Sequence, residues 1–344
     1  MNQTTTRLLN VLGTAVLGCL LNVSAATATP VVATVAKDPT DVPAPIRRSK
    51  PTTVTVNLIA TEVITEIAPG KKAWVWTFND TVPGPMIRVM QGDTVVINLT
   101  NDMNNEEPHN IDFHASMGPG GGASVTNVEP GETATLSFKA LKPGAFIYHC
   151  AGEGMAWEHI TYGMYGLIMV EPKGGLKKVD REFYVAQQDW YHDVLSGGAH
   201  GLPDYVYILD DDKALDEHPS MYTFNGHQQA LADPALFGDA MHSRQGDKVR
   251  FFFVNGGPNK SSAWHIIGTI FDEVYRSDPK DAVRAEETVA VPPGSAAVFE
   301  LTTPVPGKYL LVDHALWRAP KGAAGFLTVD QTGAWPDDIF SPQP

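Results

Sequence analysis

The sequence predicts an all-β protein made of two tandem β-sandwich domains. Short runs of Val, Ile, Thr and Phe recur along the chain, with Gly, Pro and Asn between them, at the spacing typical of a sandwich. Helical periodicity is scarce, and its best candidate is a short piece near 234–241. The clearest predicted strands are 54–59, 74–78, 94–99, 133–138 and 167–170.

The prediction of two domains rests on a repeat within the chain. A Thr-Phe-Asn tripeptide followed by a Gly-Asp pair occurs at 77–93 and again at 223–247. Each half then carries two Pro-Gly pairs around an apolar run and a histidine soon after them, His149 in the first half and His314 in the second. The shared order indicates one sandwich used twice, with a junction near 171–178.

Five segments follow from these signals. In order they are a secretory leader, an extended linker, a first domain, a second domain and a C-terminal tail. Their predicted bounds are 1–28, 29–52, 53–172, 173–335 and 336–344.

The leader has one early cation, Arg7, an apolar stretch over 8–21 and small residues that offer cleavage sites before position 28. It predicts export from the cytoplasm. A second interpretation makes residues 16–19 a lipoprotein cleavage box, with a lipid anchor on Cys19. In either case Cys150 is the only cysteine of the folded protein, so it forms no disulfide within the chain and is either an inert buried thiol or a ligand.

Composition excludes some classes of protein. The chain has 344 residues, with 25 Lys and Arg against 39 Asp and Glu, and a net charge of −14. An acidic chain without a basic stripe predicts no nucleic-acid partner. The 43% hydrophobic content is enough to form a substantial core.

A metal site is predicted around Cys150. His159 and Met164 follow Cys150 in the order Cys-x8-His-x4-Met, and His109 and His114 precede it. One thiolate, two imidazoles and a weak axial thioether are the donor set of a redox-active copper site. The second imidazole comes from His109 or His114. Taken singly, each residue is better explained as core or surface, but the ordered set favours copper.

Alternation along a strand predicts a second metal centre. Adjacent His149 and Cys150 point to opposite faces, and His109 and His114, five positions apart, also diverge. One of the earlier histidines therefore pairs with Cys150 and the other with His149. His314 is the candidate for a third imidazole at the second centre; its alternative is a strand-end histidine bonded to a carbonyl.

At these residues the sequence resembles the copper-containing nitrite reductases. The resemblance covers about residues 50–335 and is carried, in the family's order, by five motifs. These are HNIDFH at 109–114, YHC at 148–150, GMYG at 163–166, WHIIG at 264–268 and VDH at 312–314. It implies two cupredoxin-like Greek-key β-sandwiches.

The resemblance also implies the site and two coppers per chain. Its type 1 copper ligands match His109, Cys150, His159 and Met164, and its type 2 ligands match His114, His149 and His314. In the family the third imidazole comes from a neighbouring subunit, which implies a homotrimer.

Three further residues match the substrate pocket of the family. Asp112 and His265 match the proton-relaying pair, and Ile267 matches the apolar residue over the copper. Thr288 is expected to orient His265. The implied activity is one-electron reduction of nitrite to nitric oxide in the periplasm. The implied electron donor is a c-type cytochrome or a small cupredoxin.

Two rival functions stay open at this point. A multicopper oxidase reducing oxygen needs paired His-x-His motifs, and the sequence has none. A non-enzymatic electron carrier would leave His114, His149 and Asp112 unexplained. The loop after Cys150 also departs from the family pattern, because it carries Glu153 and Glu158 where apolar residues or proline are expected.

Overall fold

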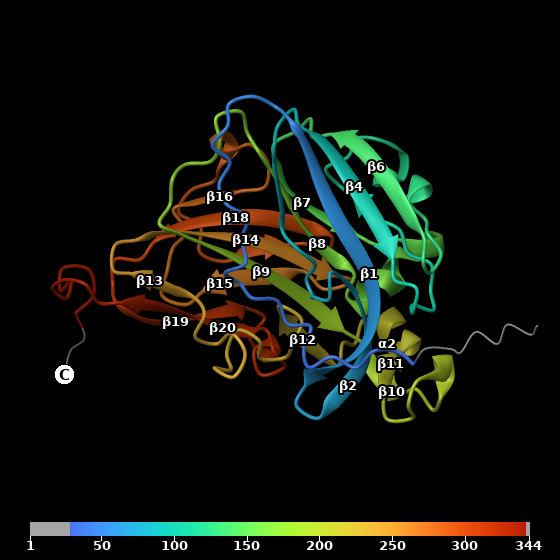
Figure 1. Cartoon of the computed structure of the whole chain (residues 1–344). Coiled ribbons are helices and arrows are strands. Elements are labelled where there is room, and N and C mark those ends of the chain that lie inside the picture. Colours follow the sequence, from blue (N-terminus) through green and yellow to red (C-terminus); the bar gives the residue numbers. More distant parts are fainter. Residues whose placement is uncertain (1–27, 342–344) are drawn as a thin grey trace, which may run out of the picture.

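The structure is a computed structural model that describes residues 28–341 of the chain. It is an all-β fold of four sheets, stacked as two sandwiches (Figure 1). The predicted leader, with Cys19, falls almost entirely outside the described residues, as do the last three residues of the predicted tail.

The first sandwich has a six-stranded sheet in the order β10-β11-β2-β1-β4-β6 and a four-stranded sheet in the order β3-β8-β7-β5. Alternating buried and half-buried residues along β4 give it one face toward the core and one toward solvent. The strands that begin in the first half are β1 Thr53–Ala68, β2 Lys71–Phe78, β3 Ile87–Met90, β4 Thr94–Asn101, β5 Asp112–Phe113, β6 Thr133–Lys139, β7 Gly144–His149 and β8 Tyr165–Glu171.

The second sandwich has two five-stranded sheets, β12-β9-β14-β18-β16 and β13-β20-β19-β15-β17. Its central strand β14 is buried along nearly its whole length because the sheet is covered on both faces. The strands of this half are β9 Arg181–Trp190, β10 His192–Leu195, β11 Tyr207–Leu209, β12 Met221–Phe224, β13 His242–Arg244, β14 Lys248–Gly257, β15 Ser262–Ile266, β16 Glu273–Tyr275, β17 Val289–Val291, β18 Ser295–Thr302, β19 Gly307–Asp313 and β20 Ala324–Asp330.

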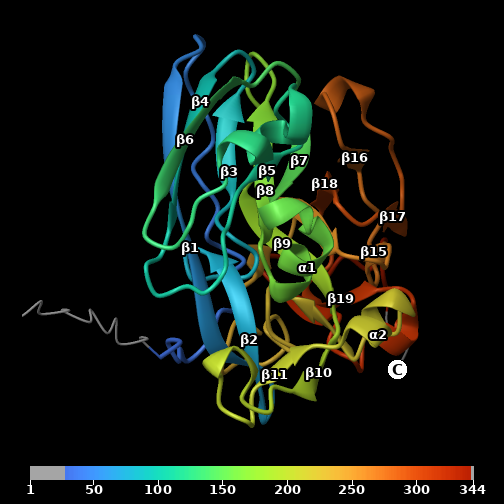
Figure 2. The same cartoon turned by 90° about the vertical axis from the view of Figure 1, so that its right-hand side faces the viewer.

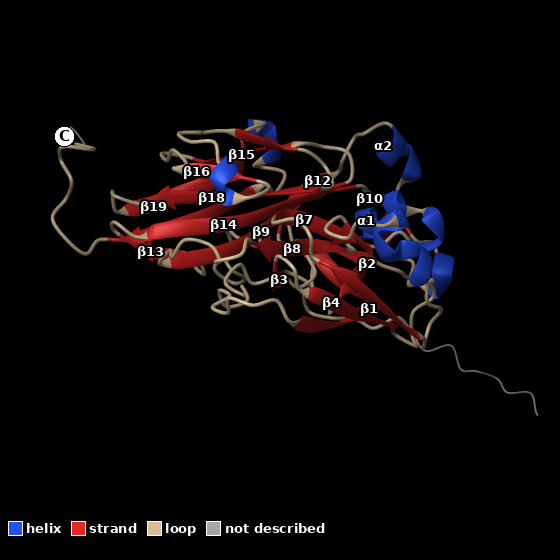
Figure 3. Cartoon of the chain, turned by 90° about the horizontal axis from the view of Figure 1, so that it is seen from above, coloured by secondary structure: helices blue, strands red, loops and turns tan. Residues whose placement is uncertain are grey.

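Helices are short and most gather at one end of the molecule, around α1, α2 and β10 (Figure 3). Within residues 28–341, no helix has the length and apolar character needed to span a membrane. The helices are α1 Ala156–Tyr162 and α2 Asp211–Leu215, with 3₁₀ turns η1 Pro119–Val125, η2 Gly152–Gly154, η3 Ala199–Gly201, η4 Pro279–Asp281 and η5 Leu316–Arg318.

The helix predicted near 234–241 is wrong. This segment is a series of turns, because Asp233 starts them: its Oδ1 accepts from the amide of Ala235 at 2.8 Å, just after Pro234. The amide of Phe237 then donates back to the carbonyl of Ala230, seven residues earlier, which no helix does. Local side-chain bonding therefore overrides the weak apolar periodicity.

Three apolar cores hold the fold together. One fills the first sandwich around Trp76 and Phe113, and one fills the second around Trp264 and Phe299. The third lies between the halves, where the β7–β8 sheet packs against β14 and β18 (Figure 2). The two halves therefore share a buried apolar interface.

Two segments connect the halves beyond that interface. The predicted linker is extended, but it is packed: Val35 is buried in the core between the halves and Ala36 in that of the second sandwich. The β10–β11 hairpin belongs to the second half in sequence, yet it extends the six-stranded sheet at β2, where Tyr207 pairs with Ala73.

Candidate metal centres

The pairing of β5 with β7 decides which way the candidate ligands point. Asp112 lies opposite His149, and Phe113 lies opposite Tyr148. Residues opposite one another in an antiparallel pair share a face. Phe113 and Tyr148 enter the first core, so Asp112 and His149 face away from it. Cys150, the next residue, returns to the core side and is fully buried.

The first cluster consists of His109, Cys150 and His159. The Cys150 Sγ lies 3.1 Å from His159 Nδ1 and 3.8 Å from His109 Nδ1, and the two Nδ1 atoms lie 3.2 Å apart. All three side chains are buried. The amide of Asn110 donates to the sulfur at 3.2 Å, which favours the thiolate form.

Backbone bonds close the loop that carries these residues. The Cys150 amide donates to the Met164 carbonyl, and the Met164 amide donates to the His159 carbonyl, each at 3.1 Å. Met164 is thereby held beside Cys150 and is fully buried. Inside the loop, α1 presents His159 on its buried face, and Gly163 with φ +123° ends the helix.

Gly152 makes room for the imidazole of His159. A Cβ at position 152 would lie 2.4 Å from His159 Cε1 and 2.6 Å from the carbonyl oxygen of Pro108. No side chain fits between these atoms, so only glycine allows the loop to approach the ring this closely.

The donor groups of the first cluster fit a soft cation. Burial lowers the pKa of His109 and of His159 to about 3, so both imidazoles are neutral. Burial raises the pKa of the Cys150 thiol to about 12, against the opposing effect of backbone amides. A cation that binds here must displace the thiol proton. Two neutral imidazoles and one thiolate, with a thioether residue alongside, are a donor set that suits copper.

Glu62 is a member of this site that the sequence analysis missed. Its Oε1 lies 3.2 Å from His109 Nε2, and both side chains are buried. The amides of Glu106 and Glu107 donate to its two oxygens. Burial raises the pKa of Glu62 to about 7, and these amide bonds oppose that rise. The sequence signal that could have indicated Glu62 is an acidic residue at a position of β1 that faces the core.

The second cluster consists of Asp112, His114 and His149. The Nε2 atoms of the two histidines lie 3.2 Å apart, and a carboxylate oxygen of Asp112 is within 4.8 Å of both ligand atoms. His149 Nδ1 donates to the Cys150 carbonyl at 2.9 Å, which leaves the Nε2 lone pair free. Burial, with a smaller effect of His149, lowers the pKa of His114. Neutral imidazoles next to a carboxylate also fit a metal ion.

A glycine of η1 lies directly against Asp112. A Cβ at Gly121 would lie 2.0 Å from Asp112 Oδ1, and Gly121 has φ +53°. The glycine-rich loop that contains Gly121 therefore packs its backbone onto the Asp112 carboxylate. No residue larger than glycine fits there.

The remaining site candidates lie together in the second half. His265 is on β15 and His314 follows β19, and their ring centroids are 5.3 Å apart. His265 Nδ1 donates to the carbonyl of Glu287 at 2.7 Å, one residue before Thr288. Ile267 follows β15 and is partly exposed. Residues 28–341 contain two groups of side chains that could hold a metal ion, and neither includes His314, so one chain does not bring His314 to the second cluster.

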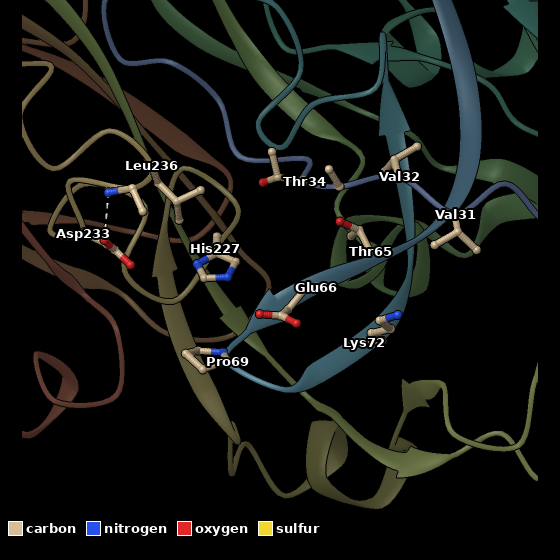
Figure 4. A pocket seen from close by; sticks show the side chains of 12 residues that line it. Val31, Val32, Thr34, Thr65, Glu66, Pro69, Lys72, His227, Asp233 and Leu236 are labelled. Carbon is tan, nitrogen blue, oxygen red and sulfur yellow. Dashed lines mark hydrogen bonds between the residues drawn. The ribbon is translucent and has the colours of Figure 1, made fainter.

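A cavity of about 500 Å³ lies apart from these residues (Figure 4). The N-terminal segment, the β1–β2 turn and the loop at 233–236 line it, with His227 and Glu66 among its side chains. None of the predicted site residues lines it. His227 does not come close enough to two further ligands to form a metal group.

Two cupredoxin-type sandwiches and a buried Cys-His-His cluster define a class of protein, the two-domain copper proteins. A family model described as multicopper oxidase matches residues 60–175. Copper-containing nitrite reductases from Neisseria meningitidis serogroup A and Neorhizobium galegae are 45% and 38% identical. The alignments cover 88% and 79% of this chain, and 76% and 73% of theirs.

Solved structures agree with this class. The copper nitrite reductase of Nitrosomonas europaea matches with a TM-score of 0.69 and 34% identity, over 82% of this chain and 95% of that one. A multicopper oxidase matches with a TM-score of 0.66 and 25% identity, over 81% and 89%. The chain belongs to the copper-containing nitrite reductase family, a family of oxidoreductases.

Proposed function

We propose that this chain reduces nitrite to nitric oxide and water in denitrification, with type 1 copper at the first cluster and type 2 copper at the second. Met164 would complete the donor set that holds copper at the first site. One observation carries the proposal: two different donor sets are reached from adjacent residues, Cys150 and His149, on opposite faces of one strand end. Bound copper would relay one electron from a donor protein to nitrite, which also takes up two protons and loses one oxygen as water.

The protein provides a short path between the clusters. One peptide unit joins Cys150 to His149, and the bond from His149 Nδ1 to the Cys150 carbonyl at 2.9 Å adds a contact across the same step. Both residues are buried and β7 holds them in place. The fixed geometry limits the reorganisation that electron transfer needs.

Protons would come from Asp112 and His265, as the family resemblance implies. Asp112 is held beside His149 by the β5–β7 pairing and by the contact with Gly121. His265 donates through Nδ1 to Glu287, so its Nε2 is free to take or give a proton. Ile267, at the end of β15, would shape the apolar side of the nitrite pocket.

His314 would complete the second cluster of a neighbouring subunit in a homotrimer. The placement of His314 outside the chain's own metal groups supports this arrangement. Co-expression of His149→Ala and His314→Ala variants tests it. Random mixing in a cyclic trimer forms about one quarter of the sites from two intact contributions. Activity near that fraction is expected, and no activity would contradict the shared site.

The electron donor would be a c-type cytochrome or a small cupredoxin, met after export to the periplasm. A leader on residues 1–28 supports the export. Cys19 offers lipid anchorage as the alternative to a free mature protein.

Anaerobic turnover with nitrite and an artificial reductant tests the proposed function. We expect nitric oxide as the product and two copper ions per chain in the same sample. One copper and no turnover would indicate an electron carrier. Four coppers with oxygen consumption would indicate a multicopper oxidase. No two of the 11 histidines are separated by a single residue, so the chain has none of the His-x-His motifs that a multicopper oxidase needs.

A further inference from the structure

We propose that Glu62 is a positioning residue of the first cluster: its carboxylate fixes the tautomer and orientation of His109, and so lowers the reduction potential of copper bound there. The effect on the reduction potential rests on the proposed function, because it requires copper at the first cluster. The hydrogen bond between Glu62 and His109 does not depend on that function.

The fold builds this contact into the first core. Glu62 is on β1 with its side chain on the inward face, among Leu58, Ala60 and Ile64. It lies opposite Trp76 on β2, whose ring packs against His109 and His159 with centroids 5.4 and 4.8 Å away. An acid in this apolar setting is costly unless its oxygens are bonded.

Two backbone amides donate to the Glu62 carboxylate. Oε1 accepts from the Glu107 amide at 2.8 Å and Oε2 from the Glu106 amide at 3.1 Å. The third partner is His109 Nε2, 3.2 Å from Oε1. A carboxylate is the acceptor-only form of the side chain, so the site is arranged for an anion.

In the proposed arrangement Nε2 of His109 carries the proton. With Nε2–H donating to Glu62, the lone pair is on Nδ1, the atom that lies 3.2 Å from His159 Nδ1 and 3.8 Å from Cys150 Sγ. A metal-bound histidine whose other nitrogen donates to a carboxylate is a stronger donor and a fixed one. A stronger donor stabilises the oxidised metal more than the reduced metal, which lowers the potential.

Glu62→Gln tests the effect on the metal, and Glu106→Gln is its matched control. Both replace an acidic side chain in the same region by a neutral one, but the Glu106 side chain contacts His200 and not His109. In Glu62→Gln we expect the ratio of reduced to oxidised first-site copper, at a fixed solution potential, to rise about tenfold, equal to about 59 mV. Glu106→Gln should change the ratio less than about twofold.

Equal changes of this ratio in the two variants would mean that the loss of an acidic group alone explains the effect, and would overturn the proposal. An unchanged ratio in Glu62→Gln would overturn it as well. Copper content is counted in each sample, so that loss of metal is not mistaken for a changed potential.

A second measurement uses the metal-free wild-type protein. It therefore depends neither on bound copper nor on whether a variant folds. Nitrogen-15 NMR of the metal-free wild-type protein, with labelled histidine, should show His109 protonated at Nε2 and slow to exchange. A proton at Nδ1 instead would overturn the proposal. If the wild-type protein binds no copper at this cluster, the proposed function fails. The spectrum still shows whether His109 donates a hydrogen bond to Glu62.

Discussion

His149 and Cys150 are consecutive residues whose side chains belong to different clusters. The Cys150 sulfur lies 3.1 Å from His159 Nδ1, whereas His149 Nε2 lies 3.2 Å from His114 Nε2. The two clusters therefore meet through a single peptide bond at the end of β7. A change at one of these residues can be confined to its own cluster, which makes the two clusters separable by mutation.

The first prediction uses this separation. In Cys150→Ala we expect the intense visible absorption of a thiolate–copper bond to disappear, while the copper at the second cluster stays. The reason is that, among the histidines of the two clusters, the sulfur contacts His109 and His159 but neither His114 nor His149. Visible spectra, electron spin resonance and copper analysis of one preparation check this. Strong absorption that persists in the variant would refute the assignment.

The second prediction concerns the glycine beneath His159. Gly152→Ala should remove the colour of the first cluster, because the new Cβ would lie 2.4 Å from the imidazole ring. Gly154→Ala is the matched control: Gly154 has φ +83° and no heavy atom near its Cβ position. That control carries backbone strain of about 1 kcal/mol without the clash. Equal loss of colour in both variants would argue against a steric role.

The third prediction concerns the loop that contacts Asp112. Asp112→Asn should slow nitrite turnover about 100-fold with copper content unchanged, since the proposed proton donor is lost. Gly121→Ala should slow it by at least about tenfold, because the carboxylate must move. Gly120→Ala has a similar φ of +62°, but its nearest contact is at 4.0 Å, so it should keep most activity. Steady-state rates across pH check all three, and equal rates for Gly120→Ala and Gly121→Ala would exclude the contact.

The fourth prediction concerns stability and pH. Asp93 accepts hydrogen bonds from Arg48 Nη1 at 2.6 Å, from the Thr52 amide at 2.8 Å and from the Met90 amide at 2.7 Å. Burial raises its pKa, but these partners outweigh burial, so the pKa is lowered. Its contribution to stability is therefore present above the unfolded pKa of about 4 and is lost as the pH falls through the folded pKa.

Asp93→Asn should accordingly cost about 2 kcal/mol of unfolding free energy at pH 7. The difference from wild type should shrink as the pH falls below about 4. Urea unfolding at several pH values measures it. The exposed Asp239→Asn, whose carboxylate lies 3.8 Å from Lys308 Nζ, is the control and should change stability by less than about 0.5 kcal/mol. A pH-independent loss in Asp93→Asn would contradict the electrostatic explanation.

Strand alternation predicted much of the site from sequence. It placed His149 and Cys150 on opposite faces and separated His109 from His114, and the structure pairs His109 with Cys150 and His114 with His149. This reasoning needs only a period of two, which is a local property of the chain. The all-β class and the five strands singled out were predicted from short Val, Ile, Thr and Phe runs between turn residues, and they are confirmed.

Other parts of the site depend on approaches between distant segments. Nothing near Glu62 in sequence indicates that its carboxylate meets His109, 47 residues later. Likewise, Gly121 and Gly152 show their roles only through the side chains that pack on them. Helix α1 was missed because seven residues are too few for a helical period to stand out. The turns at 234–241 were mistaken for a helix because the bond from Asp233 does not affect hydropathy.

The β10–β11 hairpin makes the first sandwich depend on residues from the second half of the chain. Because β11 lies beside β2 in the six-stranded sheet, a polypeptide cut near residue 172 would lose the strand that covers this edge. An uncovered edge exposes amide and carbonyl groups to other chains and promotes aggregation. A fragment limited to the first sandwich should therefore retain residues 192–209, or carry a charged substitution in β2 to protect the exposed edge.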